Sequence, residues 1–349
     1  MQNSREDIRL ALPSKGRLAD GALALLDSAG LSVYKPNPRQ YQATIPVLPG
    51  LNVLFQRAGD IPVSVRNGSV DFGITGWDTV SERGGQNGEI LTLFEELGFG
   101  HCSLEIIVPE NWAGVDRLQD LAGQRELLGR PLRVATKYME VTYRFLESAG
   151  LGDTQLIPSE GTLEVAPAIG FADLIADLVS TGTTLRDNRL KTLQDGCVLR
   201  SQACMVANRQ ALDTRPEVLA MARQLIEFIV AHLRATANVA LFANMRGASP
   251  REIADQIFSQ DVLGGLQGPT ISPVLRRDAN DWYALHIIVR RDQLSRAIAE
   301  LRSIGGSGVV VTPVTYIFEE EPEAWKAVLR ALNHGEIAAA DRNEKRRKN

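Results

Sequence analysis

The sequence predicts an α/β protein with two similar lobes followed by a smaller ferredoxin-like domain. Residues 9–31 and 133–151 each contain a β-rich run, a lysine and an amphipathic helix that ends in Ser-Ala-Gly-Leu. Residues 70–76 and 175–182 each read as an apolar strand entering a glycine turn, which is typical of parallel sheets flanked by helices. From residue 239 the order strand, helix, strand, strand, helix, strand is that of a ferredoxin-like domain.

The two repeats define the lobes. In each repeat a lysine, Lys15 or Lys137, follows the strand, and Gly30 or Gly150 fits the left-handed residue that closes a helix. Two such units indicate two lobes with a cleft between them, where ligands commonly bind. Strand–helix units also recur in α/β proteins without internal duplication, and the repeat alone leaves that alternative open.

The last third of the chain has a different pattern. A long helix is expected after Pro216, with an apolar stripe from Val218 to Leu233. The elements expected after it are strands at 239–245, 270–275, 283–289 and 309–318, and helices after Ser249, over 292–304 and over 323–332. A charged tail ends the sequence.

Composition excludes several classes of protein. Apolar residues make up 44% and charged residues 23%, as in globular proteins, and the formal net charge of −4 gives no basic character for a nucleic-acid partner. No apolar run approaches the roughly 18 residues of a membrane span, and residues 1–8 lack an apolar signal core. We therefore expect a cytoplasmic protein without a membrane partner. Three cysteines and four histidines lack ligand spacing, so no metal centre built from protein side chains is expected.

The segment from Asp177 to Leu185 carries the strongest chemical signal. A strand over 174–179 leads into Ser180, Thr181, Gly182, Thr183 and Thr184, and a helix is expected from near Leu185. Hydroxyl donors, a glycine that lets the backbone approach an anion and unpaired helix N–H groups together suit a phosphate dianion. Asp177 is placed to accept hydrogen bonds from ribose hydroxyls. The alternative is an ordinary helix cap with additional threonines.

This segment resembles the signature of the ATP phosphoribosyltransferase family, the first enzymes of histidine biosynthesis. The matching positions are Glu164, Gly170, Ala172, Asp177, Thr181, Gly182, Thr184 and Leu185. Residues 12–18, 57–62 and 71–76 look like three further motifs of the family, and the C-terminal unit is similar to the regulatory domain of its long form. The resemblance implies a two-lobed, periplasmic-binding-protein-like catalytic core and an ACT-like regulatory domain.

The resemblance also implies a reaction and a set of site residues. ATP and 5-phosphoribosyl 1-pyrophosphate would give N1-(5-phosphoribosyl)-ATP and pyrophosphate, with Mg²⁺ on the pyrophosphate. The catalytic cations would be Lys15, Arg17 and Arg57, and the ATP-binding residues Gly16, Asp71, Gly76 and Tyr138. Phosphoribosyl pyrophosphate would be bound by Glu164, Asp177, Ser180, Thr181, Gly182, Thr183, Thr184 and Leu185. The alternatives are that Lys15 and Arg17 are two solvated surface side chains and that Tyr138 is a surface residue at the start of a helix.

The third domain is expected to bind L-histidine as a feedback inhibitor. The family places the amino acid between neighbouring regulatory domains, where Leu266, Thr270, Ile288, Ser307 and Gly308 would line it. One departure is that residues 243–246 read Ala-Asn-Met-Arg, where the family often has an acidic residue. Asp261 is a candidate to replace it.

The expected division is a discontinuous lobe I over 1–104 and 198–235, lobe II over 105–197, a regulatory domain over 236–335 and a tail over 336–349. The long form of the family implies self-association from dimer to hexamer. Two alternatives are a two-lobed solute-binding protein with a sensor domain and a non-catalytic subunit. The phosphate loop and the absence of a signal core argue against the first, and the presence of loop and regulatory domain in one chain argues against the second.

Overall fold

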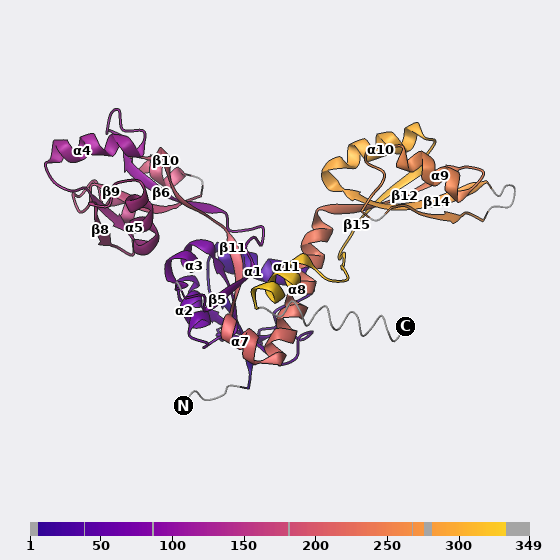
Figure 1. Cartoon of the computed structure of the whole chain (residues 1–349), viewed down its shortest axis with the longest axis horizontal. Coiled ribbons are helices and arrows are strands. Elements are labelled where there is room, and N and C mark those ends of the chain that lie inside the picture. Colours follow the sequence, from indigo (N-terminus) through magenta and orange to yellow (C-terminus); the bar gives the residue numbers. More distant parts are fainter. Residues whose placement is uncertain are drawn as a thin grey trace. The chain divides into compact units, whose positions relative to one another are not determined.

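The computed structural model describes residues 6–37, 39–85, 87–180, 182–266, 268–275 and 281–332. These residues form three β-sheets with flanking helices, distributed over two compact units (Figure 1). The first unit holds two sheets, here called the first and second lobes, and the second unit holds the third sheet. Thr181 and the predicted tail over 336–349 lie outside the described residues.

The first lobe is built on a sheet with strand order β2-β3-β1-β4-β11-β5. Strand β1 is parallel to both β3 and β4, whereas β11 is antiparallel to β4 and β5. The strands are β1 (Ile8–Pro13), β2 (Gln42–Thr44), β3 (Leu51–Gln56), β4 (Phe72–Gly76), β5 (Ile90–Phe94) and β11 (Ala203–Asn208). The other elements of this part of the chain are α1 (Arg17–Ser28), η1 (Ala58–Asp60), α2 (Ile61–Arg66), α3 (Trp77–Arg83), α7 (Arg209–Thr214), α8 (Pro216–Thr236) and, near the C-terminus, α11 (Glu323–Ala331).

The second lobe has the strand order β10-β6-β9-β7-β8. Strand β7 is parallel to β8 and β9, and β6 is antiparallel to β9 and β10. The strands are β6 (Cys102–Pro109), β7 (Arg133–Thr136), β8 (Gln155–Pro158), β9 (Leu174–Val179) and β10 (Leu190–Ser201). The helices are η2 (Leu118–Asp120), α4 (Leu121–Leu128), α5 (Met139–Ser148), η3 (Leu163–Val165) and α6 (Thr183–Asp187).

The third sheet has the order β13-β14-β12-β15, with every neighbouring pair antiparallel. Its strands are β12 (Asn238–Arg246), β13 (Thr270–Pro273), β14 (Trp282–Arg290) and β15 (Ser307–Pro313), and its helices are α9 (Pro250–Phe258), η4 (Arg291–Gln293) and α10 (Leu294–Ser303). Alternate residues of β12 and β14 are buried with Ile253 and Ile257 of α9 and with Ala297 and Leu301 of α10. Both helices therefore cover one face of this sheet (Figure 1).

The predicted fold class is confirmed, with corrections of detail. The C-terminal unit has the predicted βαββαβ order, but its last strand ends at Pro313 instead of residue 318. The sheets of both lobes are mixed, whereas the apolar runs had predicted parallel sheets. Gly30 and Gly150 have φ values of 75° and 76°, as predicted for residues that close a helix.

An aspartate precedes the central strand of each lobe, and the hydrogen bonds of the two aspartates show how the lobes correspond. Asp71 Oδ2 accepts from the Arg9 N–H at 2.8 Å, and Asp173 Oδ2 accepts from the Arg133 N–H at 2.8 Å. In return, Arg9 O and Arg133 O accept from the N–H groups of these aspartates. Asp71 is therefore equivalent to Asp173. Segments 70–76 and 175–182 each lie largely on a strand, β4 and β9, as the sequence repeat predicted.

No helix among the described residues is long and apolar enough to cross a membrane.

Asp173 gives a testable contribution to stability. Burial alone would raise its pKa, but hydrogen bonds from Arg130 and Arg133 outweigh burial and hold the pKa well below its ordinary range. A lowered folded-state pKa stabilises the protein above the unfolded-state pKa of about 4, and this contribution is lost as the pH falls below that value. We expect Asp173→Asn to lower the free energy of unfolding at pH 7 by about 2 kcal/mol.

Denaturant unfolding at pH 7 and pH 3 measures this effect. The difference between parent and variant should shrink at pH 3. Asp153→Asn is the matched control because Asp153 forms an exposed pair with Arg125, with 49% and 39% of the two side chains accessible. That pair should contribute less than about 1 kcal/mol. Equal effects of the two substitutions on the free energy of unfolding would contradict a special contribution of Asp173 to stability.

Candidate active site

The parallel strands of each lobe end at one edge of their sheet, and that edge gathers most of the predicted site residues. In the first lobe, β1, β3 and β4 are followed by residues 14–17, Arg57 and the turn at Gly76. In the second lobe, β7, β8 and β9 are followed by Lys137, the segment that contains Glu164, and residues 180–184. Carboxyl edges of parallel strands are where open α/β sheets bind ligands.

One hydrogen bond joins the two predicted motifs that are most distant in sequence. Arg17 Nη2 donates to Ser180 Oγ at 3.1 Å across 163 residues of chain. Lys15, Gly16, Arg17 and Arg57 are all exposed. The cationic segment after β1 therefore lies beside the hydroxyl-rich loop after β9.

The loop after β9 has the features expected of an anion site. Gly182 has a φ of 70°, a left-handed conformation that disfavours other residues, and it precedes α6. Ser180, Thr183 and Thr184 are exposed. Arg186 Nη2 donates to Thr183 Oγ1 at 3.4 Å, which adds a guanidinium that the sequence analysis had not singled out. The loop thus presents hydroxyl groups and a cation.

Leu185 does not line the loop with its side chain, which corrects one predicted site residue. The side chain is 9% exposed and packs in a cluster with Ile107, Ile175 and Leu190. An apolar side chain gains more from this burial than from facing a phosphate. Leu185 therefore anchors the loop to the lobe.

Two carboxylates flank the loop. Burial raises the pKa of Asp177, a hydrogen bond from Leu178 N opposes this rise, Glu164 adds to it and Lys137 reduces it. Asp177 and Glu164 are both partly exposed. They are thus close enough to interact electrostatically, and both remain available as acceptors for hydroxyl groups.

Tyr138 lies in the protein interior, so the prediction that it stacks on a purine does not fit this structure. Its side chain is 1% exposed, and its hydroxyl donates to Asp78 Oδ2 at 2.7 Å. Ser201 Oγ donates to Asp78 Oδ1 at 2.8 Å. Burial and the Asp78 carboxylate raise the pKa of Tyr138 far above its ordinary value, so the phenol remains a donor. This network joins α3 of the first lobe to the second lobe.

Asp71 is also misassigned as a nucleotide-binding residue. It precedes β4 and therefore lies at the amino edge of the parallel strands, opposite Gly76. Its carboxylate is 1% exposed and accepts from Arg215 Nη1 at 3.0 Å. Gly76 itself lies at the correct edge, where a Cβ atom would come within 2.2 Å of Asp78 Oδ1. Gly76 thus makes room for the Asp78 side chain.

Arg57 and a second arginine complete the cationic edge. Arg57 precedes η1, whose last residue, Asp60, lies 3.7 Å from Arg83 Nη1. Arg83 Nη2 is also 4.0 Å from Glu160, which follows β8. Arg83 therefore interacts with groups of both lobes.

Sequence reasoning missed Asp78, Ser201, Arg83 and Arg186. Asp78 stands two residues after the glycine turn of β4, and a polar residue at the start of a helix that follows a buried strand was the available signal. Nothing in the sequence near Ser201 indicates that it meets Asp78, since 123 residues separate them. Arg186 lies in the first turns after the loop and could have been included with it.

The predicted histidine-binding residues fall into two groups within one domain. Leu266 N donates to Ile288 O at 3.1 Å, and Thr270 begins β13, which pairs with β14. Ser307 and Gly308 lie on β15 at the opposite edge of the sheet. Asp261, the candidate replacement carboxylate, is paired with Arg296. A single domain does not bring the two groups together.

Among the residues that the structure describes, no group of three or more His, Cys, Asp or Glu side chains could hold a metal ion.

Comparison with known proteins shows the family of the chain. The family model described as ATP phosphoribosyltransferase matches residues 57–234, and the model described as HisG, C-terminal domain, matches residues 235–316. ATP phosphoribosyltransferase 1, chloroplastic, from Arabidopsis thaliana is 43% identical over 94% of this chain and 82% of its own length. The ATP phosphoribosyltransferase of Gemmatimonas aurantiaca is 38% identical over 88% of this chain and 98% of its own length.

A solved structure is also similar. The ATP phosphoribosyl transferase (HisG:HisZ) complex from Thermotoga maritima contains a chain that is 26% identical, with a TM-score of 0.50 over 64% of this chain and 98% of that chain. The two family models follow one another along the sequence and together cover residues 57–316. The chain belongs to the ATP phosphoribosyltransferase family of histidine biosynthesis, in its long form with a C-terminal domain.

Proposed function

We propose that the chain condenses ATP with 5-phosphoribosyl 1-pyrophosphate to give N1-(5-phosphoribosyl)-ATP and pyrophosphate. The observation that carries this proposal is the Arg17–Ser180 hydrogen bond. This bond places a cationic segment beside a hydroxyl-rich loop. Phosphoribosyl pyrophosphate carries a phosphate at one end of its ribose and a pyrophosphate at the other, so it needs two such anion-binding groups. Family membership supports the same reaction.

The chemistry follows from the charges at the edge. Adenine N1 attacks the anomeric carbon, the bond from that carbon to the pyrophosphate oxygen breaks, and the ribose carries positive charge in the transition state. Lys15, Arg17 and Arg57 stabilise the departing pyrophosphate. Asp177 and Glu164 accept hydrogen bonds from the ribose hydroxyls and stabilise the developing positive charge. No covalent intermediate is needed, because catalysis comes from positioning and electrostatics.

The 5-phosphate belongs on the loop of Ser180, Thr181, Gly182, Thr183 and Thr184 in this proposal. Three of these residues carry exposed hydroxyl groups in the structure, and Thr181 lies outside the described residues. Gly16 and Gly76 are the remaining proposed contacts to ATP, since both stand at the carboxyl edge of the first lobe.

Mg²⁺ is the proposed cofactor. Mg²⁺ usually keeps several waters and binds through one or two carboxylates together with substrate phosphates. Asp177 and Glu164 are the carboxylates beside the loop that fit this requirement. The ion would neutralise charge on the leaving pyrophosphate.

Feedback inhibition by L-histidine is proposed for the C-terminal domain. The two predicted groups lie on opposite edges of one sheet, so a site that uses both would need two domains, as self-association from dimer to hexamer would provide. We also propose that the two catalytic lobes, the regulatory domain and the tail divide after residues 104, 197, 235 and 335. Inhibition that acts through binding must be reciprocal, so substrates would weaken histidine binding.

Pyrophosphate release from phosphoribosyl pyrophosphate in the presence of ATP and Mg²⁺ tests the reaction. We expect the parent to release pyrophosphate only when ATP is present, and Arg17→Ala to lower kcat/KM by roughly 100-fold, as loss of a donor to a developing anion does. Arg251→Ala is the control because 85% of the Arg251 side chain is exposed in α9. An Arg17→Ala variant with parental turnover would remove Arg17 from the site.

Inhibition by L-histidine has its own test on the full chain. Millimolar L-histidine should inhibit pyrophosphate release by the parent. Thr270→Lys should raise the half-inhibitory concentration at least about tenfold, because its long cationic side chain would occupy the space proposed for the amino acid and repel the ammonium group of the ligand. Ser303→Lys is the control, since exposed Ser303 lies on α10, across the sheet. Activity of the parent that does not change with histidine would contradict the proposal.

A further inference from the structure

We propose that Glu82 is a positioning residue for the transfer reaction, because its carboxylate binds the start of α5 and so connects the two lobes. Glu82 Oε1 and Oε2 each lie 3.1 Å from Glu140 N, and Oε2 lies 3.1 Å from Val141 N. We call this contact between Glu82 and the two N–H groups the lobe latch. The inference rests on the proposed function for the identity of the substrates.

The lobe latch satisfies donors that α5 cannot satisfy by itself. Glu140 and Val141 are the second and third residues of α5, so their N–H groups have no partner within the helix. The residue before the helix, Tyr138, supplies no side-chain cap. A carboxylate at a helix N-terminus is favoured both by hydrogen bonding and by the helix dipole. The first lobe thus caps a helix of the second lobe.

The position of Glu82 in its own helix supports this function. Glu82 is the sixth of the seven residues of α3, where the negative end of the helix dipole disfavours a carboxylate. Its placement therefore does not stabilise α3. The benefit of a glutamate here lies in its contact with α5.

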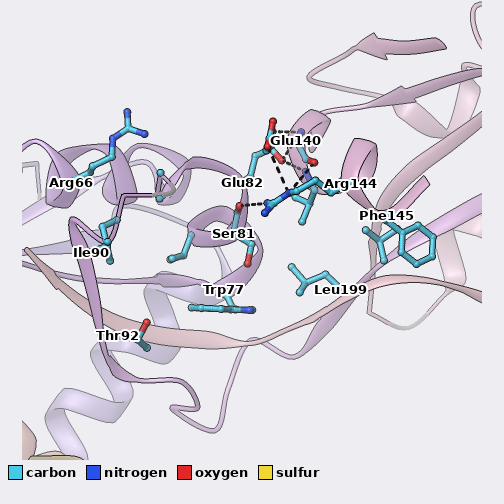
Figure 2. A pocket seen from close by; sticks show the side chains of 16 residues that line it. Arg66, Trp77, Ser81, Glu82, Ile90, Thr92, Glu140, Arg144, Phe145 and Leu199 are labelled. Atoms are coloured by element: carbon cyan, nitrogen blue, oxygen red, sulfur yellow. Dashed lines mark hydrogen bonds and ion pairs between the residues drawn. The ribbon is translucent and has the colours of Figure 1, made fainter. Parts of the chain in front are cut away.

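Polar contacts join α3 to α5 beside a pocket between the two lobes. A pocket of about 820 Å³ opens between α3 and β5 of the first lobe and α5 and β10 of the second. Trp77, Phe145 and Leu199 line it, and Figure 2 shows dashed contacts that join Ser81 to Arg144 and Glu82 to the start of α5. Arg144 Nη2 donates to Ser81 O at 3.3 Å. A pocket thus remains between the helices here, and the lobe latch and the Arg144–Ser81 hydrogen bond are polar contacts that join them.

The start of α5 leads directly to the reaction site. Lys137 and Tyr138 connect β7 to α5, and because Thr136 pairs with Ala176 in the parallel strands β7 and β9, Lys137 and Asp177 follow at the same level of the sheet. Holding the first turn of α5 against α3 therefore fixes the connection beside the proposed ribose acceptor. Without the lobe latch, the Tyr138–Asp78 hydrogen bond would still join the lobes, but the first turn of α5 would lose the two contacts that hold its N–H groups.

Steady-state kinetics and amide exchange test the proposal on the full chain. We expect Glu82→Ala to raise KM for phosphoribosyl pyrophosphate about tenfold, with kcat within about twofold of the parent, because a smaller fraction of molecules is ready to bind. The amides of Glu140 and Val141 should exchange hydrogen faster. Glu82→Gln should be intermediate, because its amide oxygen still accepts one hydrogen bond but carries no charge.

Glu140→Gln is the matched control. It removes a carboxylate from the same turn of α5, one that lies 3.7 Å from Arg144 and takes no part in the lobe latch. It should leave KM and exchange at the parental values. Parental KM or parental amide exchange in Glu82→Ala would overturn the proposal, as would an equal effect of Glu140→Gln. A fall in kcat and melting temperature at unchanged KM would show a purely structural role and would also overturn it.

Glu82→Gln supplies the same measurements if Glu82→Ala does not fold, and parental KM and exchange in that variant would then overturn the proposal. Amide exchange does not depend on turnover. A parent that releases no pyrophosphate would therefore contradict the proposed function, whereas the exchange comparison would still decide for or against the lobe latch.

Discussion

A buried carboxylate, Asp78, accepts hydrogen bonds from Tyr138 and Ser201 at the place where the two lobes meet. Burying a carboxylate is costly unless hydrogen bonds replace its water. Ser201 ends β10, and the chain crosses to the first sheet at β11 two residues later. Both lobes must therefore keep this contact, or the charge is left without partners. The arrangement of the carboxyl edges that forms the site depends on it.

At the amino edges of the two sheets, a second set of hydrogen bonds occurs in both lobes. Asp71 and Asp173 each precede a central strand and accept from the N–H group of an arginine at the start of the neighbouring strand. Arginine side chains, Arg215 in the first lobe and Arg130 in the second, bind the remaining carboxylate oxygens. Stability is thus concentrated at the amino edges. The carboxyl edges keep exposed cations and hydroxyl groups for a ligand.

Much of this organisation could be predicted from sequence. The loop at 180–184 and the segment at 15–17 were identified because glycine, hydroxyl and cationic residues after a strand have few purely structural explanations. Their contact through Arg17 and Ser180 confirms that they lie together. The order of elements in the C-terminal domain could be predicted because its strands and helices have clear periodicity.

The errors have a common physical cause. Residue type indicated polarity or aromatic character, but it did not indicate which edge or face of the fold a residue occupies. Asp71 has the chemistry of a ligand-binding residue and lies at the wrong edge, and Tyr138 has the chemistry of a stacking residue and lies inside. Contacts between distant segments, such as Glu82 with α5, depend on how two sheets meet. Local pattern carries no information about that arrangement.

The central claim is that the carboxyl edges of the two lobes bind the two ends of phosphoribosyl pyrophosphate. A crystal structure of the full chain with this compound and Mg²⁺ tests it most directly, through the positions of the phosphorus atoms. We expect the 5-phosphate within hydrogen-bonding distance of the loop at residues 180–184 and the pyrophosphate beside Lys15 and Arg17. A 5-phosphate bound away from that loop, or a pyrophosphate distant from both cations, would contradict it.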